Sequence, residues 1–124
     1  MADRDVVVLT DVMLVTCVVQ KSMADEIVRA CRDAGAEGAT VYYARGSGVR
    51  ERLGVLGVAV EVEKEVINVV VATDQMDRIV EVMYLTGKLD VPGMGILYVT
   101  RLEKAATHVP ENLLRRIRER EERP

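Results

Sequence analysis

The chain has 124 residues, of which 49% are hydrophobic and 30% are charged, and this composition is typical of a single compact domain. A domain of this length buries roughly two-thirds of the surface of its extended chain, so it needs neither disulfides nor a structural metal to fold. The net charge of -3 disfavours broad nucleic-acid binding, which depends on many Lys and Arg side chains, and no apolar run reaches the roughly 18 residues of a membrane span.

The N-terminal part of the chain predicts one or two strands followed by a helix. Residues 6–19 are almost continuously apolar and β-branched, with one Thr-Asp break, which fits one long strand or two short ones. Ser22 and Asp25 then form a capping-box pattern, and apolar residues recur at helical spacing up to Gly35. We therefore expect a helix over about 23–34.

The middle of the chain predicts a strand, a loop and a longer strand. Residues 40–44 are rich in strand formers, and the glycine- and arginine-containing stretch 45–54 is typical of a loop. From residue 58 onward valine alternates with glutamate, and residues 66–72 are almost all apolar. We therefore expect the longer strand to begin exposed and to end buried.

The C-terminal part predicts a second helix, a fourth strand and a helical tail. Asp74 can cap a helix over about 75–86, and a connection containing proline and glycine leads to a strand over 96–101. Pro110 then opens a charged helix, which we expect over about 110–122.

The order strand, helix, strand, strand, helix, strand is the split βαβ arrangement of ferredoxin-like folds. We therefore expect an α+β fold, a βαββαβ sandwich with two helices on one face of a four-stranded sheet. One domain spans 1–124, with its core at about 12–104 and a C-terminal helical tail. Apolar residues occupy both sides of the first strand, whereas helices cover only one side. The exposed apolar face predicts a homo-oligomer.

Few residues offer chemistry to a catalytic or metal site. The single histidine, His108, and the two cysteines, Cys17 and Cys31, lack metal-ligand spacing, and no nucleophile and base form a pair, so we expect neither a metal site nor an enzyme. Cysteines within apolar segments predict reduced, buried thiols in a cytoplasmic protein. Three glutamates are expected to be solvated on one strand face rather than to form a catalytic pair: Glu61, Glu63 and Glu65.

Two loops carry groups that can bind an anion. Arg45, Arg50 and Arg52 alternate with glycines, which suits a phosphate, an acidic partner surface or an ordinary solvated loop. The triplet Thr86-Gly-Lys88 is similar to the end of a P-loop, but the earlier glycine of that motif is missing and the triplet ends a predicted helix instead of opening one, so a helix end explains it better. Together with Gly93-Met-Gly95 it forms a turn whose backbone N–H groups can surround an anion.

These stretches together resemble the PII signal-transduction family across about residues 13–104. The resemblance rests on Gly-Ala-Thr-Val at 38–41, on Arg-Gly-Ser-Gly at 45–48, and on the Thr-Gly-Lys-Leu and Gly-Met-Gly-Ile-Leu-Tyr runs within 86–98. They are similar to the start of the family's second strand, the start of its T-loop and its B-loop. The run 66–74 is similar to the strand before its second helix.

The resemblance implies a ferredoxin-like homotrimer without catalytic activity. It implies that ATP, ADP or AMP binds as a regulatory ligand in the clefts between subunits. It also implies that the loop 45–57 controls a protein partner, such as a membrane transporter or an enzyme. No nucleic acid and no other cofactor are expected. The resemblance and the local cations suggest these nucleotide-binding residues: Gly38, Thr40, Gly46, Ser47, Gly48, Arg50, Val70, Gly87, Lys88, Gly93, Met94, Gly95, Arg101 and Lys104.

The sequence departs from the family pattern in the T-loop and in the cleft. Its T-loop is several residues shorter and lacks the tyrosine that is uridylylated in the family, so that modification is not expected. The B-loop lysine has no counterpart, and Ala105-Ala-Thr-His108 replaces the closing Arg-x-Arg pair. The rival function is therefore a nucleotide-independent trimer with a structural or partner-binding role. With four glycines and few apolar anchors, the loop 45–57 is expected to be mobile without a partner.

Overall fold

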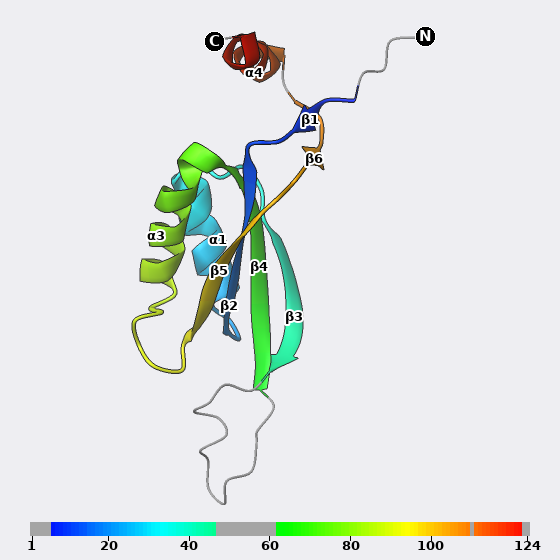
Figure 1. The fold of residues 1–124 in the computed structure, drawn as a ribbon. Coiled ribbons are helices and arrows are strands. Elements are labelled where there is room, and N and C mark those ends of the chain that lie inside the picture. The colour runs from blue at the N-terminus through cyan, green and yellow to red at the C-terminus, as the bar shows by residue number, and fades with distance from the viewer. Residues whose placement is uncertain (1–5, 47–61, 110, 123–124) are drawn as a thin grey trace, which may run out of the picture.

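The computed structural model of the chain describes residues 6–46, 62–109 and 111–122. Four strands form an antiparallel sheet in the order β3-β4-β2-β5 (Figure 1). The central strand β2 pairs with both β4 and β5, so that Val15 lies opposite Val69 on one side and Val99 on the other. The strands are β2 (Val12–Gln20), β3 (Thr40–Gly46), β4 (Val62–Ala72) and β5 (Gly95–Arg101). This topology confirms the predicted ferredoxin-like α+β fold.

Two helices cover one face of this sheet (Figure 1). They are α1 (Ala24–Asp33) and α3 (Met76–Thr86), and the short 3-10 helix η2 (Thr73–Gln75) precedes α3. Their apolar faces meet the odd-numbered residues of β2, and burial of these side chains is the main force that holds the layers together. The centre of the core consists of Val15, Cys17, Val19, Ile27, Ile67, Ile79 and Met83, all fully buried.

The N-terminus of α1 is capped by a neighbouring strand and not by the predicted Ser22 and Asp25. The N-cap position is Met23, which provides no side-chain hydrogen bond, and Ser22 has a positive φ of 77°. Instead the Ala24 backbone N–H donates to Oε1 of Glu65 on β4, at 3.3 Å. Glu65 is buried, so the expectation that it lies on a solvated face is wrong. A carboxylate at this position complements the positive end of the helix dipole.

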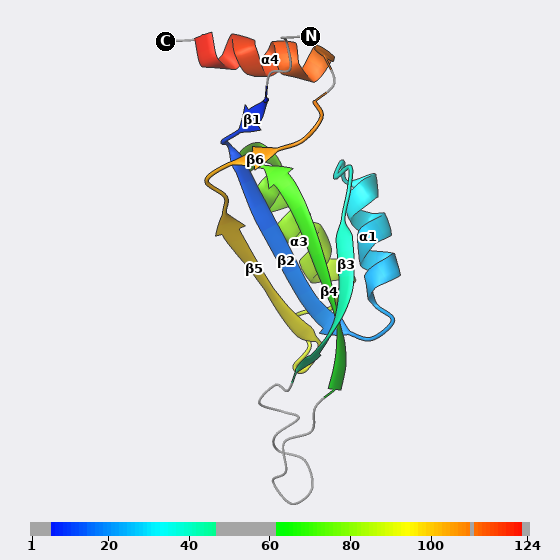
Figure 2. The same cartoon turned by 90° about the vertical axis from the view of Figure 1, so that its right-hand side faces the viewer.

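A two-stranded ribbon extends beyond one end of the sheet. The Thr-Asp break separates β1 (Val8–Leu9) from β2, and β1 pairs with β6 (Ala105–Ala106), a strand that the sequence did not predict. The predicted tail helix is present as α4 (Glu111–Glu122) and lies beyond this ribbon (Figure 2). No helix in the described ranges is long and apolar enough to span a membrane.

The sheet face opposite the helices is apolar and is not covered by any described element (Figure 2). Strand alternation places the even-numbered residues of β2 and β4 on this face. A buried Thr16 hydroxyl donates to the Asn68 carboxamide oxygen at 2.7 Å near its centre. Around that pair lie large side chains that are about half exposed: Tyr42, Val70, Ile96 and Tyr98. The predicted exposed apolar face is therefore present.

Candidate functional site

The expected nucleotide-binding residues fall into two groups within one chain. Strand register places one group where β5 begins and β3 ends, and the other toward the opposite end of the sheet. The first group comprises Gly46, Gly87, Lys88, Gly93, Met94 and Gly95. The second comprises Gly38, Thr40, Val70, Arg101 and Lys104. The remaining three, Ser47, Gly48 and Arg50, lie outside the described residues, as does most of the loop 45–57 whose mobility was predicted.

The expected nucleotide-binding residues are also far apart in a single chain. Gly95 and Arg101 are the two ends of β5, which puts six residue steps, or roughly 20 Å, between them. Gly46 ends one edge strand and Gly95 begins the other, so they lie three strand spacings or roughly 14 Å apart across the sheet, and register adds three residue steps or roughly 10 Å along it. The described part of a single chain therefore does not assemble a closed nucleotide site.

The connection between α3 and β5 uses most of its own backbone donors. The Gly87 N–H, which we expect from the sequence to be one of the anion donors, donates within this chain to the Met83 carbonyl at 2.9 Å and so closes the helix. The amides of Lys88, Leu89, Val91 and Met94 also donate to carbonyls within the helix end or the connection. Within the described connection, the N–H groups of Asp90 and Gly93 remain without a hydrogen-bond partner and are its available anion donors.

Two of the glycines in this connection are required by packing inside the chain. A Cβ at Gly95, whose φ is 153°, would lie 2.2 Å from the Val18 carbonyl oxygen, and a Cβ at Gly87 would lie 2.9 Å from the Met83 oxygen. Neither distance is tolerated without a backbone shift. Lys88, with φ at 55°, takes the left-handed position that glycine usually provides at a helix end.

Gln20, at the end of β2, holds this connection in place. Its side-chain Nε2 donates to the Gly93 carbonyl oxygen at 2.7 Å. Gly93 itself has a positive φ of 85°, so the peptide is fixed in a turn that favours glycine. Sequence reasoning did not identify Gln20, because a single polar residue at the end of a strand carries no distinctive signal.

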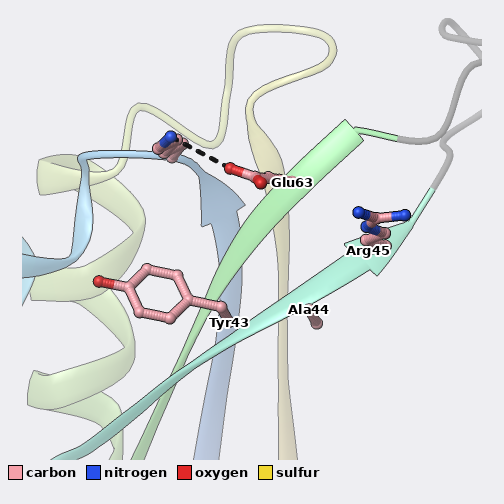
Figure 3. Close-up of a pocket in the computed structure, with 5 residues that line it drawn as sticks. Tyr43, Ala44, Arg45 and Glu63 are labelled. Carbon is pink, nitrogen blue, oxygen red and sulfur yellow. Dashed lines mark ion pairs between the residues drawn. The ribbon is translucent and has the colours of Figure 1, made fainter.

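A separate hollow lies beside the edge strand β3, at the end of the sheet where β3 ends and β4 begins (Figure 3). Among the described residues it is lined by Lys21, Tyr43, Ala44, Arg45 and Glu63, and its volume is about 590 Å³. We refer to it as the Arg45 pocket. Lys21 Nζ lies 3.1 Å from Glu63 Oε2, and this ion pair is largely exposed to solvent. Of the lining residues, only Arg45 and Glu63 were noted in the sequence, and neither was assigned to a nucleotide site.

The two cysteines are buried in the core and are not nucleophiles. Burial, with a smaller contribution from the nearby Cys31, raises the pKa of the Cys17 thiol to about 12, and burial raises the pKa of Cys31 to about 11. Both thiols are therefore protonated at neutral pH, whereas the thiolate is the reactive form. Within the ranges that the structure describes, no group of three or more His, Cys, Asp or Glu residues is placed to hold a metal ion.

A family model described as nitrogen regulatory protein P-II matches residues 12–111. The chain belongs to the P-II family. The match starts at the first residue of β2 and stops at the first residue of α4, so β1 and nearly all of α4 lie outside the matched range. The members of this family are regulators rather than enzymes, and they bind small ligands such as ATP or ADP.

The crystal structure of Arabidopsis thaliana PII bound to citrate has the same fold. It superimposes with a TM-score of 0.62 at 20% sequence identity, covering 76% of this chain and 79% of that chain. A search of curated proteins gave no significant match. The resemblance to PII seen in the sequence is thus confirmed by the family match and by the fold.

Proposed function

We propose that this P-II protein is a cytoplasmic homotrimer that binds ATP, ADP or AMP between its subunits. In this proposal the bound nucleotide regulates a protein partner, such as a transporter or an enzyme, through the loop 45–57. The observation that carries the proposal is the uncovered apolar sheet face, together with the position of the expected nucleotide residues at both ends of that sheet. A neighbouring subunit covers the face and brings one group of residues against the other.

The ligand is expected to be anionic. Arg101 and Lys104 are exposed cations in the second group, and the free amides of Asp90 and Gly93 are donors in the first. Arg50, which follows the Gly46-x-Gly48 turn, is the cation that we expect from the sequence to reach an anion held by the connection before β5. The citrate in the Arabidopsis thaliana structure supports an anionic ligand for the family. A phosphate chain is the anion that the resemblance implies for this chain.

A nucleotide-independent trimer is the second candidate function, and one observation favours it. Gly87, Lys88 and Met94 donate their N–H groups inside the chain, and Gly87 and Gly95 are required by internal packing. The glycines that resemble a B-loop would therefore be needed even if no nucleotide bound. A protein with this fold can therefore retain these glycines for packing and act only by binding a protein partner.

Calorimetry distinguishes the two candidates. The full chain is titrated separately with ATP, ADP and AMP, and the oligomeric state is measured by light scattering in the same buffer. We expect a trimer that binds at least one nucleotide with a Kd well below about 1 mM. A trimer that gives no heat with any of the three nucleotides at millimolar concentration would establish the second candidate. A monomer would contradict both.

A further inference from the structure

We infer that α4 is an interaction surface for a second copy of this chain, and that in the assembled protein the α4 helices of neighbouring subunits pack against one another through Leu113. The inference rests on the proposed homotrimer, but it concerns an element that the P-II match leaves out. The match stops at residue 111, whereas α4 runs over Glu111–Glu122. The P-II domain therefore does not account for this helix, and its packing needs an explanation of its own.

Within the described part of the chain, α4 has almost nothing to pack against. It makes few contacts with the other elements. Figure 2 shows it beyond the β1–β6 ribbon, crossing the direction of the strands and away from α1 and α3. A helix of 12 residues is only marginally stable in water by itself, since most helical stability in proteins comes from tertiary packing. The helix therefore requires a partner that its own chain does not supply.

The first turn of α4 presents an apolar side chain to that partner. The helix is amphipathic, and its own chain leaves Leu113 42% exposed, whereas the neighbouring Leu114 is half-buried. Burying Leu113 against another apolar surface removes it from water and stabilises the helix at the same time.

The ribbon joins this apolar residue to the uncovered sheet face. Val8 pairs with Ala106 and Met13 with Arg101, so five residues of each strand separate the two rungs, and the ribbon continues the β2–β5 pairing without a shift of register. Alternation then puts Val8 and Ala106, both exposed, on the side of the even-numbered residues of β2. The face assigned to the neighbouring subunit thus continues along the ribbon toward α4.

The charges of α4 favour a second copy of the helix over other partners. The helix contains four arginines and four glutamates and so has no net charge. Nucleic acids and anionic membranes attract segments with an excess of basic residues, which α4 lacks. Charges of both signs complement a surface that is itself mixed, and another α4 is such a surface. Cyclic symmetry places the three α4 helices at the same end of the trimer, where they can meet.

Disulfide crosslinking of the full-length protein tests the contact between copies. Leu113→Cys adds one accessible thiol, whereas Cys17 and Cys31 stay buried and protonated and do not react. Oxidation with diamide should join chains at least about fivefold faster than in Arg115→Cys, because two residues turn a helix by about 200° and place that exposed position on the opposite side. Denaturing gels show the covalent dimers. Equal rates for the two variants would overturn the inference.

Amide hydrogen exchange separates this inference from the proposed trimer. In a protein that light scattering shows to be a trimer, the α4 amides should exchange at least about tenfold more slowly than in Leu113→Lys. Asn112→Lys adds the same charge at the preceding exposed residue and should keep the slow exchange. A trimer whose α4 amides exchange alike with and without Leu113→Lys would overturn the α4 contact alone. A monomeric parent protein would contradict the proposed function as well.

Discussion

At the start of β5, the backbone of Gly95 runs so close to β2 that a side chain does not fit. Because a Cβ there would lie 2.2 Å from the Val18 carbonyl oxygen, Gly95→Ala should lower the free energy of unfolding by about 2–4 kcal/mol. Gly38→Ala is the matched control, since a Cβ at Gly38 meets no atom within 4 Å, and it should change stability by less than about 1 kcal/mol. Urea denaturation measures both, and equal effects would remove the steric argument.

The raised pKa values of Cys17 and Cys31 predict a loss of stability at high pH. The thiols ionise near the ordinary pKa of 9.0 in the unfolded chain and only near 12 and 11 in the folded one. Their contribution is therefore complete below pH 9 and declines as the pH rises toward 11–12. Lys and Tyr side chains titrate in the same range, so the decline is compared with that of the Cys17→Ala/Cys31→Ala double variant. The variant should show the shallower decline, and parallel curves would contradict the prediction.

Arg50, outside the described residues, remains the cation that sequence reasoning places closest to a bound phosphate chain. If it crosses the cleft between subunits, Arg50→Ala should weaken ATP binding by about 1.5–3 kcal/mol, the usual contribution of hydrogen bonds to charged groups. Calorimetry measures the loss, and circular dichroism checks that folding is unchanged. Unchanged affinity would exclude Arg50 as the anchor and leave Lys88, Arg101 and Lys104 as the cations to test.

At the scale of single elements, α1 depends on β4 for its N-terminal cap. Glu65→Ala removes the carboxylate that accepts the Ala24 N–H inside the protein, and it should cost about 1–2 kcal/mol of stability. Glu63→Ala, two residues earlier on the same strand face, breaks only the exposed pair with Lys21 and should cost less than about 1 kcal/mol. Chemical denaturation of the two variants tests this order, and a larger loss for Glu63→Ala would reverse our interpretation.

The elements that sequence analysis located correctly are those with a clear apolar period. Ile27 and Cys31 mark the buried face of α1, and Ile79 and Met83 mark that of α3. The cap of α1 could not be predicted in this way, because Glu65 lies 41 positions from Ala24. The β1–β6 ribbon was missed for a different reason, since two residues per strand are too few to show alternation.

The residues of the candidate nucleotide site could be predicted only where a short stretch of sequence contains the motif. The glycines of the connection before β5 stood out in the sequence, but the contact that requires Gly95 comes from the Val18 carbonyl on another strand. The hydrogen bond from Gln20 to Gly93 likewise joins residues 73 positions apart. Patterns within one segment contain no information on such approaches. The Arg45 pocket depends in the same way on the pairing of β3 with β4.

At the scale of the whole molecule, the uncovered sheet face predicts how the protein assembles. Ile96 is 60% exposed on that face, so Ile96→Lys should leave the single chain folded and convert the proposed trimer to monomers. Leu85→Lys is the matched control, because Leu85 is 63% exposed on α3 at the other side of the molecule. Light scattering gives the masses. A trimer that survives Ile96→Lys would place the subunit interface elsewhere.

The β1–β6 ribbon also determines how the domain responds to tension. Val8 is paired with Ala106, and farther along the chain Met13 is paired with Arg101, so β1 leads into β2 at the same end at which β5 leads into β6. A force that pulls residues 6 and 109 apart therefore acts first on the β1–β6 ladder and then on the outermost rung between β2 and β5. Hydrogen bonds loaded in this geometry break one after another instead of sharing the load. The protein should accordingly open like a zipper, at low force, from its ribbon toward the Gln20 and Gly93 end.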